Sequence, residues 1–125
     1  MGAFSVGVVG ESYRQHALKA LAGDRRQRGD QVFFSAVLVP EPTNQFDSNA
    51  VRVHIQGGAH VGYLSREDAI DYRAGMAVLI ARHAAGLCPA KLIGGGSGKP
   101  TIGVVLDLAS PDVMLSAVVP NEQPF

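Results

Sequence analysis

The sequence predicts an α+β fold, most simply a small β-barrel of five to seven strands with two flanking helices. Short apolar segments rich in β-branched residues recur along the chain and are separated by glycine, proline or polar turns. Only two segments have helical periodicity, and strands and helices do not alternate regularly. This pattern disfavours a parallel βαβ sheet and favours a barrel with helices on its ends or edges.

The first predicted strand and helix occupy the N-terminal part of the chain. An apolar segment at residues 4–9 predicts the strand. Ser12 and Gln15 have the spacing of a capping box, in which each side chain bonds the other residue's backbone amide, so we expect a helix from there to about Ala22. Residues 24–30 then predict a charged turn.

Three strands are predicted in the middle of the chain. Residues 32–39 form a strongly apolar segment, and a polar loop over residues 42–49 separates it from a second strand at residues 50–55. Gly57-Gly58 is typical of a hairpin turn, from which residues 60–64 return as a short strand.

A second helix and two further strands follow. Ser65 and Asp68 mark a helix N-terminus, and Gly86 is expected to end that helix. One stripe of the predicted helix carries Ala69, Arg73, Met76, Ala77, Ile80 and Ala84. Residues 87–93 and 101–108 predict the two strands, joined by a glycine-rich loop.

The length of 125 residues fits one domain. We expect the barrel domain to span residues 1–110, with residues 111–125 as a C-terminal tail or an extra edge strand. Residues 113–119 have the composition for that strand.

The charge balance excludes one class of nucleic-acid-binding protein. Eleven basic and eleven acidic residues give a formal net charge of +0, so the chain is no globally basic, histone-like binder, although a local basic patch is compatible with it. The sequence has no apolar run of about 20 residues and no signal-peptide pattern, which predicts a soluble, cytoplasmic protein without membrane contact. Cys88 is the only cysteine and is expected to be buried and inert.

Several familiar catalytic or cofactor motifs are incomplete. The glycine-rich residues 94–99 lack the first glycine and the final hydroxyl residue of a phosphate-binding loop, because Ile93 and Pro100 stand there. His54 and His60 lie on adjacent predicted strands, but two histidines without a third ligand make a poor zinc site. We therefore predict no cofactor and no metal.

No catalytic arrangement stands out, so the chain is predicted not to be an enzyme. A metal-dependent nuclease remains as a remote alternative, with carboxylates from Asp47, Glu67, Asp68 and Asp71. The last three, however, fit the first turns of a helix, where acidic residues favour the helix dipole.

Two segments combine aromatic and polar residues in ways that suggest binding. Residues 10–16 place Tyr13 and Arg14 at a helix start, which suits a phosphate group, although a capped helix with Tyr13 packed on the barrel is an alternative. Residues 44–49 favour Asx turns between two strands, but such turns do not explain Phe46 at the tip of a polar loop.

Three motifs in order along the chain resemble the HIRAN domain family. They are VVGESY at residues 8–13, EPTNQFDSNAV at residues 41–51 and VGYLS at residues 61–65. The resemblance covers residues 8–68, about half of the chain. It implies an OB-like β-barrel with flanking helices.

The resemblance also implies a function. In the best understood members, the domain lies at the front of DNA translocases and captures the 3′-hydroxyl end of single-stranded DNA. Bacterial members occur alone or fused to nucleases and helicases. The chain is accordingly expected to bind single-stranded DNA 3′ ends in DNA repair or processing, alongside a DNA-processing ATPase or nuclease.

The resemblance assigns roles to particular residues. Asp47 would accept a hydrogen bond from the terminal 3′ hydroxyl, while Tyr13 and Phe46 would stack on the terminal bases. The remaining DNA contacts would come from Ser12 and Arg14 at a phosphate, Asn44 in the nucleotide pocket and Tyr63 beside the nucleotides. Asn49 would brace the loop.

A second hypothesis from another class is a protein-interaction or autoinhibitory barrel that keeps the scaffold but has lost DNA binding. It is motivated by the neutral charge and by the lack of any aromatic residue between Tyr72 and Phe125. Pull-down of a protein partner, without oligonucleotide binding at low salt, would favour it.

Overall fold

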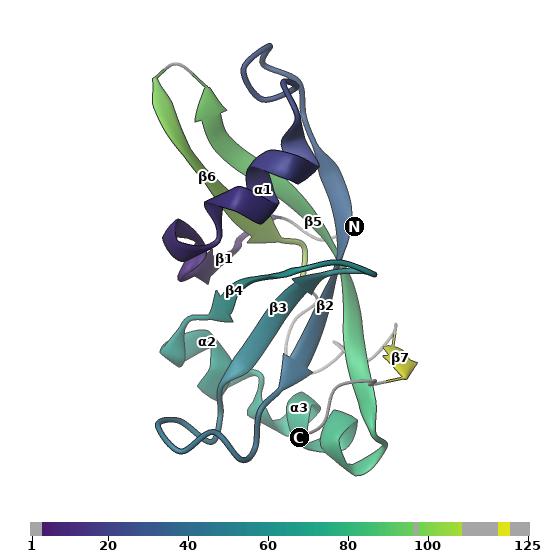
Figure 1. Ribbon diagram of the computed structural model, residues 1–125. Coiled ribbons are helices and arrows are strands. Elements are labelled where there is room, and N and C mark those ends of the chain that lie inside the picture. Colours follow the sequence, from purple (N-terminus) through teal and green to yellow (C-terminus); the bar gives the residue numbers. More distant parts are fainter. Residues whose placement is uncertain (1–3, 97, 109–117, 121–125) are drawn as a thin grey trace.

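A closed antiparallel barrel forms the centre of the protein. The computed structural model describes residues 4–96, 98–108 and 118–120, and its ribbon is shown in Figure 1. The strands are β1 (Val6–Val9), β2 (Phe33–Pro40), β3 (Val51–Ile55), β4 (His60–Leu64), β5 (Ala84–Gly96), β6 (Lys99–Leu106) and β7 (Val118–Pro120). In the described part of the chain, six strands run in the order β2-β3-β4-β1-β6-β5, and pairing of β2 with β5 closes the barrel. The predicted α+β barrel is therefore confirmed.

Helices cover the two ends of this barrel. A 3-10 turn, η1 (Glu11–Tyr13), and helix α1 (Gln15–Ala22) follow β1, and α1 packs against β4 and β6. Helices α2 (Arg66–Asp71) and α3 (Arg73–Ala81) lie toward the opposite end in Figure 1, where α3 packs against β2 and β5. No helix in the described ranges is long and apolar enough to cross a membrane.

The core fills the barrel with aliphatic side chains. Fully buried residues from most of the strands and two helices meet in one cluster, which includes Leu18, Leu38, Val53, Val61, Leu79, Leu92 and Leu106. Cys88 belongs to the same cluster, and burial raises the pKa of its thiol to about 12. The expectation of a buried cysteine is confirmed.

The predicted second helix is in fact two short helices. Ser65 caps α2 as expected, since its hydroxyl oxygen accepts from the Asp68 amide at 3.1 Å. The buried Tyr72 then separates α2 from α3, and α3 ends at Ala81 rather than near Gly86. His83 adopts a positive φ of 51° and reverses the chain, so the apolar run after it becomes β5. Apolar spacing alone cannot separate a buried strand from a continuing helix.

The C-terminal part of the sheet extends further than predicted. β5 and β6 continue through most of the glycine-rich segment as one hairpin, with Gly96 opposite Lys99. β7 pairs with Ala84–Gly86, which agrees with an extra edge strand, while residues 113–117 of that prediction lie outside the described residues.

Candidate nucleic-acid interface

A row of outward-facing residues connects the two candidate binding segments, residues 10–16 and the polar loop at residues 44–49. Val9 at the end of β1 lies opposite Tyr63 on β4, and Tyr63 lies opposite Arg52 on β3. Arg52 Nε in turn lies 3.4 Å from Glu41 Oε2, at the start of the polar loop. The β1–β4–β3 surface therefore runs from η1 at one side to the loop at the other.

The close approach of β1 and β4 fixes this row. Gly62 precedes Tyr63, and a Cβ atom added there would lie 2.5 Å from the carbonyl oxygen of Val9 and would also strike the Val8 side chain. A register irregularity in the β3–β4 pairing lies between Val53 and His54, close to the same point. Only glycine fits this position, so the site of Tyr63 depends on it.

Three consecutive side chains of the first candidate segment (residues 10–16) are exposed to solvent. Gly10, at φ 80°, turns the chain out of β1 into η1. Tyr13 is 87% exposed, and Ser12 and Arg14 are exposed beside it, so Tyr13 does not pack on the barrel. The exposed side chains are available to a ligand.

The predicted capping box at this segment is wrong. Helix α1 begins after Arg14, and no side chain caps it, because Ser12 lies within η1. The Gln15 side chain instead reaches across to β6: its Nε2 donates to the Ile102 carbonyl at 2.8 Å and its Oε1 accepts from the Ile102 amide at 2.8 Å. Gln15 Nε2 also donates to the Glu11 carbonyl at 2.9 Å, so one amide group ties η1 to the barrel.

The polar loop is held by its own Asx turns. Asn44 Oδ1 accepts from the amides of Phe46 and Asp47 at 2.8 and 3.0 Å, and Asn44 Nδ2 donates to Glu41 Oε1 at 3.0 Å. Asp47 Oδ1 accepts from the Asn49 amide at 2.9 Å. These bonds leave Phe46 83% exposed at the tip. Asn44 therefore shapes the loop from within.

Arg66 joins the loop side of this surface, although the sequence motifs assign it no specific role. Its Nε lies 3.7 Å from Asp47 Oδ2, and its Nη2 lies 3.5 Å from the Phe46 carbonyl oxygen. The side chain is otherwise exposed at the start of α2. The available signal was its position directly after the VGYLS motif, three residues beyond Tyr63.

Two histidines extend the surface along the β3–β4 hairpin. The rings of His54 and His60 stack with centroids 5.2 Å apart, and the Tyr63 ring lies nearly perpendicular to His60 with centroids 4.9 Å apart. His60 Nε2 lies 2.7 Å from the Gly62 carbonyl oxygen. Desolvation lowers the pKa of His60 to about 4 and also lowers the pKa of His54, and the nearby Arg52 and Arg14 act in the same direction.

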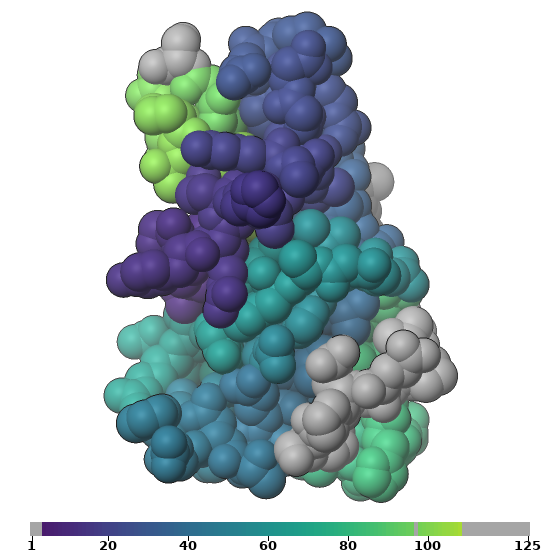
Figure 2. All heavy atoms as spheres, in the orientation of Figure 1, coloured from purple at the N-terminus to yellow at the C-terminus, as the bar shows by residue number. Residues whose placement is uncertain are grey.

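The candidate residues thus fall into two groups on one surface. Tyr13, Arg14 and Ser12 stand at the η1 side, while Asn44, Phe46 and Asp47 stand at the loop side with Arg66. Tyr63 and Arg52 lie between the two groups. Figure 2 shows this arrangement, in which the purple η1 segment projects beside the teal surface of β4 and the blue loop lies below. Within the part of the chain that the structure describes, no ring contact joins Tyr13 to Phe46, so the two rings are not packed on each other.

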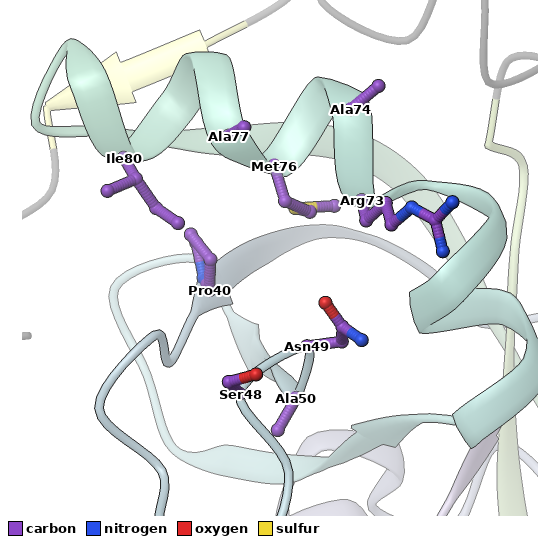
Figure 3. A pocket seen from close by; sticks show the side chains of 9 residues that line it. All are labelled: Pro40, Ser48, Asn49, Ala50, Arg73, Ala74, Met76, Ala77 and Ile80. Carbon is purple, nitrogen blue, oxygen red and sulfur yellow. The ribbon is translucent and has the colours of Figure 1, made fainter.

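A cavity of about 360 Å³ lies behind the polar loop (Figure 3). Its walls come from the end of β2, the second half of the loop and α3, namely Pro40, Ser48, Asn49, Ala50, Arg73, Ala74, Met76, Ala77 and Ile80. The lining is mostly apolar and offers no acid–base pair. Groups of three or more metal-ligating side chains are absent from the described ranges, so the histidine pair gains no third ligand there.

Comparison with known proteins gives two matches. The family model described as the HIRAN domain matches residues 1–81. A crystal structure of a protein from Lactobacillus plantarum has 23% sequence identity and a TM-score of 0.50, over 81% of this chain and 85% of that chain, which supports the fold. A search of curated proteins found no match.

Proposed function

Because the chain belongs to the HIRAN domain family, a family of DNA-binding modules, we propose that it is a non-catalytic module that captures the 3′-hydroxyl end of single-stranded DNA. The observation that carries the proposal is the pair of exposed aromatic residues, Tyr13 and Phe46, on the two sides of the β1–β4–β3 surface. Stacking on exposed aromatic rings is the usual way in which proteins hold unpaired bases.

The loop supplies the group for the 3′ hydroxyl in this proposal. Asp47 Oδ1 accepts a hydrogen bond from the Asn49 amide. Asp47 Oδ2 lies 3.7 Å from Arg66 Nε, which is too far for a hydrogen bond, so Oδ2 would accept one from the 3′ hydroxyl. A 3′ phosphate would bring negative charge against the same carboxylate. Charge and hydrogen bonding at Asp47 would therefore together favour a 3′ hydroxyl over a 3′ phosphate.

The remaining residues would hold the strand behind its end. Arg14 and Ser12 lie exposed beside Tyr13 and suit the first phosphate, while Arg66 suits a phosphate near the loop. Tyr63 would lie beneath the nucleotides at the centre of the surface. We place the complete DNA-binding unit within residues 1–110 and propose that it serves a DNA-processing ATPase or nuclease in repair.

A fluorescence anisotropy titration tests end capture directly. Matched single-stranded oligonucleotides carrying a 3′ hydroxyl or a 3′ phosphate would be compared at low salt, with wild type, Asp47→Ala and the control Asp71→Asn, an exposed carboxylate at the end of α2. We expect wild type and the control to prefer the 3′ hydroxyl by about tenfold, the effect of one charge-assisted hydrogen bond. Asp47→Ala should lose that preference.

Equal affinity of wild type for both ends, unchanged by Asp47→Ala, would overturn end capture. Absence of any oligonucleotide binding at low salt would overturn the DNA-binding proposal as a whole and favour a protein-interaction barrel.

A further inference from the structure

The histidine pair lies next to the proposed DNA site, and end capture assigns it no role. We define the histidine patch as His54, His60, Arg52 and Arg14. His54 and His60 are stacked neighbours across the β3–β4 hairpin, and His60 contacts the Tyr63 ring. The patch therefore shares Arg52 with the row described above and extends it past Tyr63 along the same outer surface.

The polar atoms of this patch are incompletely paired. His54 Nε2 is shielded from solvent without a hydrogen-bond partner in the described part of the chain. Arg52 Nε is also shielded and lies 3.4 Å from Glu41 Oε2, without hydrogen-bond geometry. Shielded polar atoms that lack partners cost free energy, and an anion beside the patch would offset part of that cost for the positively charged Arg52 and for a protonated His54.

The charge around the pair is positive on balance. Arg52 on β3 and Arg14 after η1 both act electrostatically on the two rings, while Glu41 is the acidic group that acts on His54. Arg14 is exposed and adjoins Tyr13, the proposed base-stacking residue. A strand whose 3′ end is captured at Asp47 and whose terminal bases stack on Phe46 and Tyr13 would therefore have its next phosphates near the patch.

We propose that the histidine patch binds internucleotide phosphates behind the captured 3′ end, and that the imidazole rings take up a proton when DNA binds. The inference rests on the proposed function and adds to it a path for the strand and a linkage to pH. A phosphodiester brings an anion to two rings that desolvation and, to a smaller extent, the two arginines keep neutral, and its oxygens can accept from the N–H groups of the protonated rings.

The direction of the pH effect follows from the groups that face the rings. In the free protein, desolvation, Arg52 and Arg14 disfavour the imidazolium form, whereas the Gly62 carbonyl at His60 and the Gly58 backbone and Glu41 at His54 favour it only in part. A bound phosphate adds a strong favourable partner, so the complex takes up protons at a higher pH than the free protein does. DNA affinity should therefore rise as the pH falls from neutral toward about 5.

The test uses a 3′-hydroxyl oligothymidylate of about ten nucleotides, because neither thymine nor a phosphodiester titrates in this range. Affinity would be measured at about pH 5 and about pH 7.5 at constant ionic strength. We expect wild type to bind about tenfold more tightly at the lower pH, which corresponds to one proton taken up over about one pH unit of that interval. The double variant His54→Gln/His60→Gln should lose the dependence, and the control His16→Gln, an exposed residue of α1, should keep it.

A second readout needs no variant. The NMR titration of the ¹⁵N-labelled imidazoles would be recorded with and without the oligothymidylate, and the His60 pKa should rise by about two units in the complex, the shift that a tenfold gain in affinity near pH 5 requires. Arg52→Gln should reduce that rise, while Arg82→Gln, an exposed arginine after α3, should leave it unchanged.

The outcomes separate this inference from the proposed function. If the oligonucleotide binds with a 3′-hydroxyl preference but affinity does not depend on the histidines and their pKa values stay unchanged, the patch is overturned and end capture stands. If inorganic phosphate shifts the histidine pKa values but no oligonucleotide binds, the patch is a phosphate site without DNA, and both proposals about DNA are overturned. A pH dependence that persists in the double variant also overturns the patch.

Discussion

Tyr13 and Phe46 are left in solvent while the backbone beneath them is fixed. Tyr13 follows an η1 turn that Gln15 ties to β6, and Phe46 stands on a loop closed by the Asn44 side chain. In contrast, Tyr72 is buried between α2 and α3. An exposed ring on an ordered backbone loses little further freedom when it binds a base, which favours affinity.

The first prediction concerns these two rings. Tyr13→Ala and Phe46→Ala should each weaken oligonucleotide binding by about 1–3 kcal/mol, the usual contribution of one base–aromatic stack. Because both side chains are more than four-fifths exposed, the free energy of unfolding should change by less than about 0.5 kcal/mol. Anisotropy titrations and urea unfolding measure the two quantities. Phe33→Ala, at a 60% exposed ring on β2, is the matched control, and an equal loss of affinity in it would contradict a specific role for Tyr13 and Phe46.

At the scale of elements, the sequence predicted correctly those features whose hydrogen bonds join residues close together in the chain. The Gly57-Gly58 hairpin, the Ser65 cap and the turns of residues 44–49 were all predicted from short-range chemistry, and the structure contains them. The signals failed where the partner is distant. Gln15 looked like a capping residue, but its partner Ile102 is 87 residues away on β6.

The candidate site, too, could be predicted from the sequence only where local motifs mark its residues. Tyr63 and the loop residues were identifiable from their motifs, whereas Arg52 joins the surface only through its register opposite Tyr63. Tyr63 also faces Val9 because Gly62 lets β4 approach β1 closely, which no pattern within β4 reveals. Arg66 reaches Asp47 because α2 begins beside the loop, again a tertiary fact.

The second prediction concerns the attachment of η1 and α1 to the barrel. Gln15→Leu removes the side-chain bonds to both backbone groups of Ile102 and to the Glu11 carbonyl, so it should lower the free energy of unfolding by about 1–3 kcal/mol. It should also weaken DNA binding, because Tyr13 and Arg14 lose their fixed position. Urea unfolding and anisotropy test both effects. Gln27→Leu, at an exposed position of the charged turn, serves as control, and wild-type stability of Gln15→Leu would contradict the anchoring role.

The stability of the whole molecule should depend on pH through the histidine pair. Burial and the neighbouring arginines lower the pKa of His60 to about 4 and lower that of His54, compared with the ordinary 6.5. The unfolded chain therefore binds protons first as the pH falls, so stability is fully present above about 6.5 and is lost toward the folded pKa near 4. The rings are only partly buried, so screening by solvent limits the loss to the order of 1 kcal/mol.

Urea unfolding between about pH 7.5 and about pH 4.5 measures this third prediction. His60→Gln should flatten the decline, since glutamine does not titrate. Glu11 works in the opposite direction, because burial raises its pKa and protonation then favours the folded state. A decline that is as steep in His60→Gln as in wild type would show that other groups cause the loss.

Although the net charge of the molecule is zero, its arginines are in two different environments. Arg25, Arg26 and Arg28 are engaged within and around the charged turn, through backbone carbonyls and through Asp24 and Asp30. Arg14, Arg52 and Arg66 instead stand along the β1–β4–β3 surface and the adjoining loop. The balance of 11 basic and 11 acidic residues is thus compatible with a short basic track.

The fourth prediction follows from the shortness of that track. Two or three arginines neutralise only two or three phosphates, so the slope of log Kd against log salt concentration should be shallow, about 1.5 to 2 in magnitude for single-stranded DNA. Affinity should instead depend on a free end. Anisotropy titrations against sodium chloride, with a linear oligonucleotide and a circular single strand of the same sequence, measure both properties. A steep slope with equal binding to the circular strand would mean that the protein follows the phosphate backbone and does not hold an end.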